Sequence, residues 1–215
     1  MIIAVDGPTA SGKGTIAKAL AAEFGLPHLD TGLLYRAVGR QCARNGGDPD
    51  NSDDALAACL FADELLDDPE LRSEATGGLA SRVSVHPAVR HALYERQRAF
   101  ATQPGGAVLD GRDIGTVIAP EAEVKLFVVA SVPARAERRF AEMQAQGRSV
   151  SLAEISQDLE ARDLRDRTRS EAPLTAAPDA VLIDTSDLPR DAAIAAAIAL
   201  VRRALAASRD DEAKF

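Results

Sequence analysis

The chain has 215 residues, of which 46% are hydrophobic and only 4% aromatic, so it is long enough for one domain with an aliphatic core. Its formal charge of -8 argues against a protein whose main role is to coat nucleic acid. No apolar run approaches the ~20 residues of a membrane span, and a strand starting at Ile2 leaves no room for a signal peptide, so we expect a cytoplasmic protein without a membrane partner.

The first element is a strand over residues 2–5, followed by a glycine-rich turn and a helix. Gly7, four intervening residues, Gly12 and Lys13 form the phosphate-loop pattern, in which backbone N–H groups and a lysine bind phosphate oxygens. Most such loops have Ser or Thr directly after the lysine, but here Gly14 stands there and Thr15 comes next. We therefore predict ATP binding by Gly7, Pro8, Thr9, Ala10, Ser11, Gly12, Lys13, Gly14 and Thr15.

The remaining elements alternate between short apolar strands and longer helices. Further strands are predicted over residues 26–29, 107–109, 124–129 and 181–183. Helices are predicted over residues 33–44, 55–61 and 88–102, and a capping box starts another at Ser151. Between residues 63 and 87 the pattern is weak, and Gly77-Gly78 is expected to interrupt a helix. This order predicts a single α/β domain with a five-stranded parallel sheet and helices on both faces.

Polar residues follow three of these strands. Asp6 ends the first strand, Asp30-Thr31 follows the second, and Asp110-Gly111-Arg112-Asp113 follows the third. Ligands in such a sheet bind at the carboxyl ends of the strands, where an acid beside a phosphate loop can hold magnesium or its waters. Asp30 could instead cap a helix, and residues 110–113 could be a solvated turn. We predict that Asp110 holds Mg²⁺ through water and that Thr15 is a second candidate ligand.

A charged segment follows Ser151 on the last helix before the fifth strand. At about 100° per residue, three apolar side chains define its inward stripe, namely Leu152, Ile155 and Leu159. Arg162, Asp166 and Arg169 continue that stripe. A solvated helix face would be the ordinary reading of a charge run, but charges on the inward side must face a polar cavity or be paired. The spacing therefore predicts a clamp for phosphate and sugar.

Together these segments closely resemble bacterial cytidylate (CMP) kinase, in the nucleoside monophosphate kinase superfamily. The resemblance covers residues 2–185. It rests on the phosphate loop and on four further segments, which are residues 29–36, 89–100, 110–117 and 162–174. The Asp-Gly-Arg-Asp and Arg/Asp motifs are more specific than the phosphate loop. The adenylate kinase motif, Phe-Pro-Arg after Asp-Gly, is missing here.

The resemblance implies a role for each matching position. The catalytic residues would be Lys13, Arg112 and Arg169. CMP would be bound by Thr31, Tyr35, Arg36, Ser81, Arg90, Arg112, Asp113, Arg162, Asp166 and Arg169. Within that set, Arg36, Arg112 and Arg169 would contact the acceptor phosphate, Ser81, Arg90 and Asp113 the cytosine, and Arg162 and Asp166 the pentose. Arg138 would lie near the ATP adenine.

The implied reaction transfers the γ-phosphoryl group of ATP, bound with Mg²⁺, to CMP or dCMP in pyrimidine metabolism. We expect a monomeric P-loop kinase domain over residues 1–215, with a lid at 144–150 and a shortened acceptor-binding insert at 54–87. The insert is too short for the small antiparallel sheet of longer members, which leaves the margin of CMP over UMP open. Two alternatives remain: another kinase of this fold, of UMP/CMP or shikimate/gluconate type, or a non-catalytic nucleotide-binding regulator.

Overall fold

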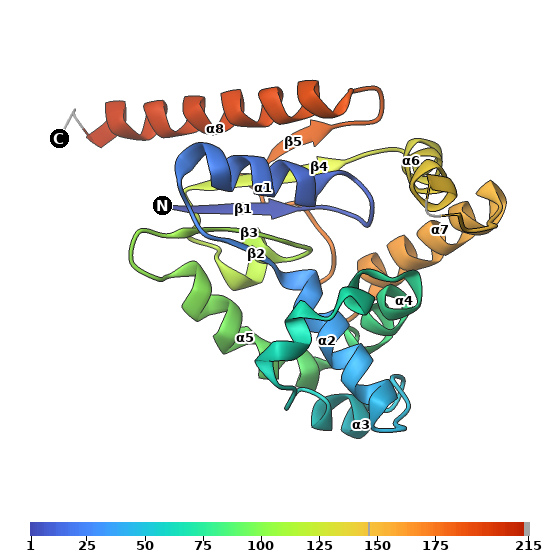
Figure 1. Ribbon diagram of the computed structural model, residues 1–215. Helices are drawn as coiled ribbons and strands as arrows, with labels where there is room; N and C mark the ends of the chain where they lie inside the picture. The colour runs from blue at the N-terminus through green and yellow to red at the C-terminus, as the bar shows by residue number, and fades with distance from the viewer. Residues whose placement is uncertain (146, 213–215) are drawn as a thin grey trace.

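Five parallel strands form the central sheet in the computed structural model, which describes residues 1–145 and 147–212 (Figure 1). The strand order is β2-β3-β1-β4-β5. The strands are β1 (Ile2–Asp6), β2 (His28–Asp30), β3 (Ala107–Gly111), β4 (Val124–Val129) and β5 (Val181–Asp184). This confirms the predicted fold class and all five strands, with β2 lying one to two residues later than predicted.

Helices cover both faces of the sheet, because successive side chains of each strand point to opposite sides. Ile3 and Val5 pack against α1 (Lys13–Phe24) and α8 (Arg190–Glu212), which Figure 1 shows on one side of the sheet. Ile2 and Ala4 face α5 (Pro87–Ala101) and the single helical turn η3 (Ile114–Ile118) on the other side. None of the described helices combines the length and apolar character needed to cross a bilayer.

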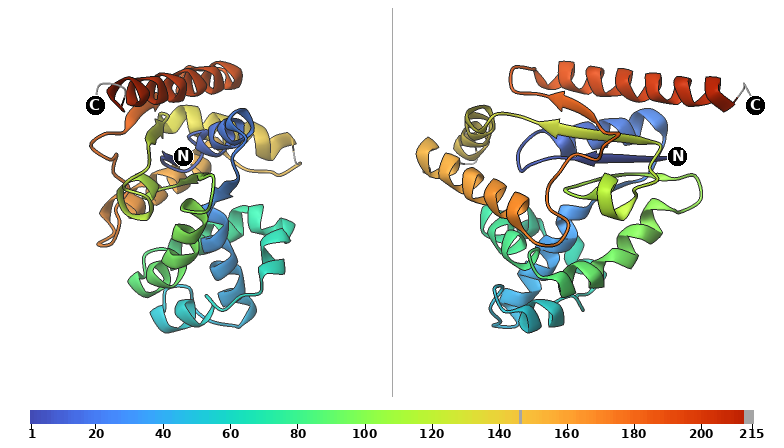
Figure 2. Two further views of the ribbon diagram at one scale, coloured as in Figure 1. Left: turned by 90° about the vertical axis from the view of Figure 1, so that its left-hand side faces the viewer. Right: turned by 180° about the vertical axis from the view of Figure 1, so that it is seen from behind.

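The segment between β2 and β3 forms a helical lobe on the side of the sheet away from α8, as the two further views show (Figure 2). Its elements are α2 (Thr31–Arg44), α3 (Ser52–Ala57), η1 (Asp63–Asp67), η2 (Pro69–Arg72), α4 (Glu74–Val83) and α5. Asn51 caps α3 by accepting hydrogen bonds from the backbone amides of Asp53 and Asp54. The described residues 54–87, predicted as the insert, contain helices and no strand.

One prediction in this lobe is wrong, because α4 runs through Gly77 and Gly78 without a break. The Ser73 hydroxyl caps the helix by accepting from the Thr76 amide at 3.2 Å. The helix also packs closely on α2: a Cβ placed on Gly39 would lie 2.8 Å from the Leu79 Cβ. Capping and packing thus outweigh the low helix propensity of two glycines.

Two helices that pack against each other, α6 (Val132–Ala145) and α7 (Leu152–Thr168), lie beside the pocket described below. The predicted capping box at Ser151 is present. Leu152 was predicted to point inward, but it is 42% exposed. Val150, just before the cap, packs with Ile155 against α6 in its place, an arrangement known as a hydrophobic staple. The predicted lid at 144–150 includes residue 146, which lies outside the described residues.

Candidate functional site

The phosphate loop joins β1 to α1 and has the backbone geometry that its glycines predict. A Cβ on Gly7 would lie 2.1 Å from the carbonyl oxygen of Val128, so only glycine lets the loop pass this close to β4. Gly12 has a left-handed φ of 89° at the N-cap of α1, and Ala10 also has a positive φ of 61°. The loop therefore places the amino end of α1, with its unpaired N–H groups, where an anion can bind.

Lys13 lies among charged groups from several strand ends. Its ammonium group donates to the carbonyl oxygen of Pro8 at 3.3 Å. Burial and the nearby Arg112 lower the pKa of Lys13 to about 8, while Asp110 and other carboxylates act in the opposite direction. The loop therefore holds a lysine whose charge is not fully balanced by protein groups, as expected where phosphate binds.

The strand-end residues lie together, as the sequence predicts. Asp6 is 4% exposed, and its carboxylate accepts from the amides of Ile114 at 2.9 Å and Gly115 at 2.8 Å. Burial raises the pKa of Asp6 to about 7, although these two hydrogen bonds lower it. The Thr31 hydroxyl donates to the carbonyl oxygen of Asp110 at 2.9 Å, which joins the end of β2 to the end of β3.

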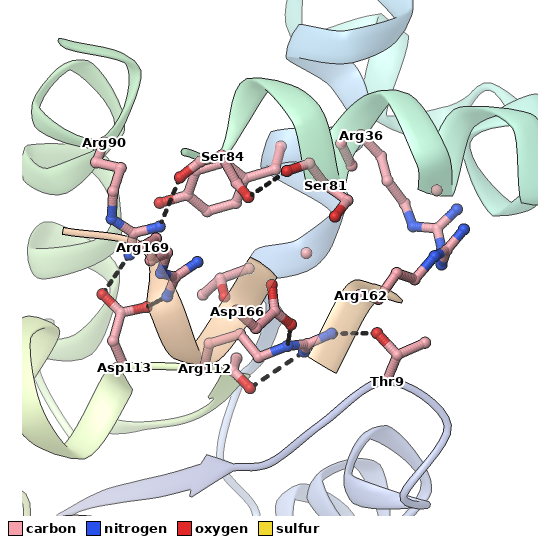
Figure 3. Close-up of a pocket in the computed structure, with 16 residues that line it drawn as sticks. Thr9, Arg36, Ser81, Ser84, Arg90, Arg112, Asp113, Arg162, Asp166 and Arg169 are labelled. Atoms are coloured by element: carbon pink, nitrogen blue, oxygen red, sulfur yellow. Dashed lines mark hydrogen bonds and ion pairs between the residues drawn. The ribbon is translucent and has the colours of Figure 1, made fainter. Parts of the chain in front are cut away.

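The ten residues predicted to bind CMP all line one pocket between the sheet, the helical lobe and α7 (Figure 3). Thr9, Gly32, Gly77, Ala80, Ser84 and Gly111 complete its lining. Five arginines face this pocket, namely Arg36, Arg90, Arg112, Arg162 and Arg169. Arg162, Asp166 and Arg169 are each less than 10% exposed, so the inward stripe of α7 does face a polar cavity. The alternative of a solvated helix face is wrong for these three residues.

Asp113 joins two arginines at one end of the pocket (Figure 3). Arg90 donates to its carboxylate at 2.5 Å and stacks over the Tyr35 ring, with 5.4 Å between the guanidinium carbon and the ring centroid. The second contact is looser, since Arg169 Nη2 lies 3.7 Å from the other carboxylate oxygen. That Nη2 is buried without a hydrogen-bond partner, and burial together with Arg90 lowers the pKa of Arg169. An unpaired buried guanidinium nitrogen is a feature that an anionic ligand would satisfy.

Arg112 lies between the pocket and the phosphate loop. Its Nε donates to the Asp166 carboxylate at 2.7 Å, and its Nη2 donates to the Thr9 hydroxyl at 2.5 Å. Burial opposes the charge on Arg112, but Asp166, together with Asp110 and Asp30, outweighs this effect and raises the pKa of the guanidinium. Arg112 is therefore held as a cation at the junction of the two regions.

Arg36 and Arg162 meet at the opposite end of the pocket, next to Gly77 (Figure 3). Arg36 donates to the carbonyl oxygens of Leu71 at 2.7 Å and Ser73 at 2.8 Å. Burial and the positive charge of Arg162 lower the pKa of Arg36 to about 10. Two neighbouring guanidinium groups make this end suitable for a negatively charged ligand group.

Several residues of the site were not identified from the sequence. Glu74 forms ion pairs with Arg139 and Arg162, which joins the helical lobe to α6 and α7. Arg135 and Asp163 form a buried pair between α6 and α7. The only sequence signal for Asp163 was its place within the charged segment. These pairs connect distant parts of the chain, and no spacing pattern encodes them.

Of the ten residues predicted to bind ATP, only Thr9 lines this pocket. Arg138 donates to the carbonyl oxygens of Thr185 and Ser186, and the Thr185 hydroxyl donates to the Ser11 carbonyl at 2.9 Å. Arg138 thus lies on the β5 side of the phosphate loop, and its contact with adenine stays a prediction. Thr15 lies in the first turn of α1, and its contact with magnesium stays a prediction.

Asp110 has the chemistry required for a magnesium site beside the loop. It is 3% exposed, with one carboxylate oxygen 2.7 Å from His28 Nε2 and the other facing Gly14, where a Cβ would lie 3.6 Å away. Among the described residues there is no group of three or more His, Cys, Asp or Glu side chains that could hold a metal. Mg²⁺ is commonly bound by one or two carboxylates together with substrate phosphates, and Asp110 fits that arrangement.

Comparison with known proteins gives one consistent family. Residues 3–203 match the family model described as cytidylate kinase. A protein named cytidylate kinase from Rhodopseudomonas palustris (strain TIE-1) is 54% identical over 210 residues, covering 97% of this chain and 99% of its own length. Another of that name, from Caulobacter sp. (strain K31), is 54% identical over 209 residues and 95% of each chain. A crystal structure of an uncharacterized Eubacterium ventriosum protein shares the fold, with a TM-score of 0.54 and 16% identity over 96% of this chain and 98% of its own.

Proposed function

This chain belongs to the cytidylate kinase family, and we propose from this that it transfers the γ-phosphoryl group of ATP to CMP or dCMP. It is a nucleoside monophosphate kinase, and so a phosphotransferase. The products are ADP and CDP or dCDP. We further propose that the enzyme serves pyrimidine metabolism as a cytoplasmic monomer with neither nucleic acid nor a membrane as partner.

One observation carries the proposal at the level of residues: an arginine-lined pocket meets the phosphate loop at Thr9, which accepts a hydrogen bond from Arg112. ATP bound to the loop and a monophosphate in the pocket would therefore have their phosphates directed toward each other. Arg112 lies between them, and Lys13 lies on the donor side. Such end-to-end placement is what in-line phosphoryl transfer requires.

The acceptor atom in this reaction is a phosphate oxygen that is already ionised at neutral pH. No strong general base is therefore required, and catalysis rests on positioning and on charge stabilisation. Lys13 would bind the β- and γ-phosphates of ATP, while Arg112 and Arg169 would contact oxygens of the transferred group. Mg²⁺, held by Asp110 through water and with Thr15 as a second candidate ligand, would neutralise charge on the ATP phosphates. The possible lid at 144–150 would exclude water from the reacting group.

The other end of the pocket supports recognition of a pyrimidine base. Arg90 and Asp113 present a donor and an acceptor that are each at most 10% exposed in their side chains. Ser81 also lines the pocket, and its hydroxyl accepts from Arg165 at 3.0 Å. Buried polar groups of this kind reject a base that leaves them unpaired, so Ser81, Arg90 and Asp113 would select cytosine. Arg162 and Asp166 would hold the pentose, Arg36 the phosphate, and Thr31 and Tyr35 would complete the acceptor site.

The decisive experiment is an ADP-release assay with ATP and, in turn, CMP, dCMP, UMP, AMP and shikimate. We expect turnover with CMP and dCMP to exceed turnover with UMP and AMP, and shikimate to give none. Lys13→Ala should abolish turnover, which controls for a contaminating kinase. Phosphorylation of shikimate in preference to CMP would replace this function with a hydroxyl-directed kinase. ATP binding without turnover of any acceptor would favour a regulatory protein.

A further inference from the structure

The side chain and backbone of Thr9 receive hydrogen bonds from two arginines in different parts of the chain. Arg112, at the end of β3, donates from Nη2 to the Thr9 hydroxyl at 2.5 Å. Arg135, in α6, donates from Nη1 to the Thr9 carbonyl oxygen at 3.0 Å. Within the phosphate loop, Thr9 is thus contacted both from the acceptor pocket and from the helix that precedes the possible lid.

Both arginines are bound on their other side to acids of one helix, α7. Asp166 accepts from Arg112 Nε at 2.7 Å, as Figure 3 shows. Asp163 accepts from Arg135 at 3.0 Å and 2.6 Å through its two oxygens. Residues three apart lie on one side of a helix, so both acids can point toward the loop. Thr9, Arg112, α7 and Arg135 therefore form a closed circuit of hydrogen bonds.

The arm through Arg135 does not line the pocket but is built to be rigid. Arg135 is 2% exposed and Asp163 is 5% exposed, and Arg135 Nε also donates to the carbonyl oxygen of Ala130 at 2.9 Å. A buried guanidinium keeps such contacts because water cannot replace them. Attachment of α7 at two points limits both its rotation and its distance from the loop. Arg162 on that helix and Arg169 at its C-cap depend on this placement.

We propose that Thr9 is a positioning residue that couples the phosphate loop to the acceptor-binding arginines. This inference rests on the proposed function. The hydroxyl of Thr9 orients Arg112 before either nucleotide binds, so the guanidinium does not have to be ordered during the reaction. The role is separate from that predicted for Thr9 within the loop, which concerns its backbone and the ATP phosphates.

The test compares Thr9→Val with Thr9→Ser and wild type under saturating ATP and CMP. Valine keeps the shape of threonine and the carbonyl that binds Arg135, but it removes the acceptor for Arg112. We expect kcat to fall about tenfold in Thr9→Val, with the KM for ATP within about twofold of wild type. Thr9→Ser restores the hydroxyl and should recover most of the lost kcat. Melting temperatures and circular dichroism verify that both variants fold.

Asp163→Asn provides a second test, because it weakens the contact between Arg135 and α7 and does not change a residue that lines the pocket. The Thr9→Val/Asp163→Asn double variant should lose kcat by a smaller factor than the product of the two single-variant factors. The reason is that each change alone already breaks the same circuit of hydrogen bonds. Losses that multiply fully would overturn the coupling. Three other results would also overturn it. They are a folded Thr9→Val enzyme with kcat within twofold of wild type, a Thr9→Val enzyme in which only the KM for ATP rises, and a Thr9→Ser enzyme as impaired as Thr9→Val. If wild type does not phosphorylate CMP, the proposed function fails and this inference fails with it.

Discussion

Replacing Gly77 with alanine should impair the enzyme without destabilising it. The added Cβ would lie 2.9 Å from Arg36 Nη2 and 3.2 Å from Arg162 Nη1. Ordinary contacts begin near 3.4 Å, so the Arg36 guanidinium must retreat by about 0.5 Å. The far end of a long side chain can move at little cost in stability. The movement nevertheless displaces the Arg36 guanidinium, which would bind the acceptor phosphate.

The expected magnitudes differ for activity and stability. A misplacement of 1 Å at a reacting centre can cost about 100-fold, so about 0.5 Å should cost on the order of tenfold in kcat/KM for CMP, or about 1.4 kcal/mol. Alanine is favoured over glycine inside a helix by about 1 kcal/mol, which offsets the strain of moving Arg36. The melting temperature of Gly77→Ala should therefore stay at or slightly above that of wild type.

Gly78→Ala is the matched control, because it makes the same change in the next residue of α4, where nothing lies within 4 Å of the added Cβ. It should gain about 2–4 °C in melting temperature, the shift that ~1 kcal/mol produces in a protein of this size, and keep its activity. Steady-state ADP release with varied CMP measures kcat/KM, and thermal unfolding measures stability. Equal kcat/KM in the two alanine variants would refute the reasoning.

Four further predictions concern separate features of the site. Arg169→Ala should lower kcat on the order of 100-fold while the fold persists, and wild-type turnover in this variant would contradict its role as a phosphate clamp. Asp113→Asn should lower the ratio of kcat/KM for CMP to that for UMP; an unchanged ratio would argue against its assignment to the base. The pKa of Asp6 is about 7 in the folded protein and near 3.8 in the unfolded chain, so between these pH values the folded state holds a proton that the unfolded state has lost. The free energy of unfolding therefore falls as pH rises from about 4 to about 7. Urea unfolding at pH 5 and pH 8 should show wild type losing stability relative to Asp6→Asn, and a constant difference would exclude this ionisation. Gly39→Ala should destabilise by about 1–3 kcal/mol, because its Cβ would lie 2.9 Å from the backbone carbon of Leu79, and an unchanged melting temperature would count against that close packing.

Much of the fold and of the candidate pocket follows from local patterns. Strands buried on both faces of a parallel sheet are continuous apolar runs, so the sequence locates β1, β3 and β4 closely. The apolar run of the edge strand β5 is located as well, although only Ile183 of that strand is buried. Helical periodicity alone places Arg162, Asp166 and Arg169 on one side of α7, and the structure brings all three into the pocket. These features depend on residues near one another in the chain.

Other features depend on how elements pack, and no local pattern determines them. Leu152 is exposed because Val150 takes its place against α6, and Gly77 is needed because two arginines from other helices pass beside it. His28 meets Asp110 only because β2 pairs with β3. In the same way, one hydrogen bond of the circuit through Thr9 joins two residues that are 126 positions apart in the chain. The distances between such groups are set by the angles at which α4, α6 and α7 pack against one another and against α2. Those angles result from the sum of many packing contacts, so the sequence determined which groups the site would contain, and the tertiary structure alone decided which of them touch.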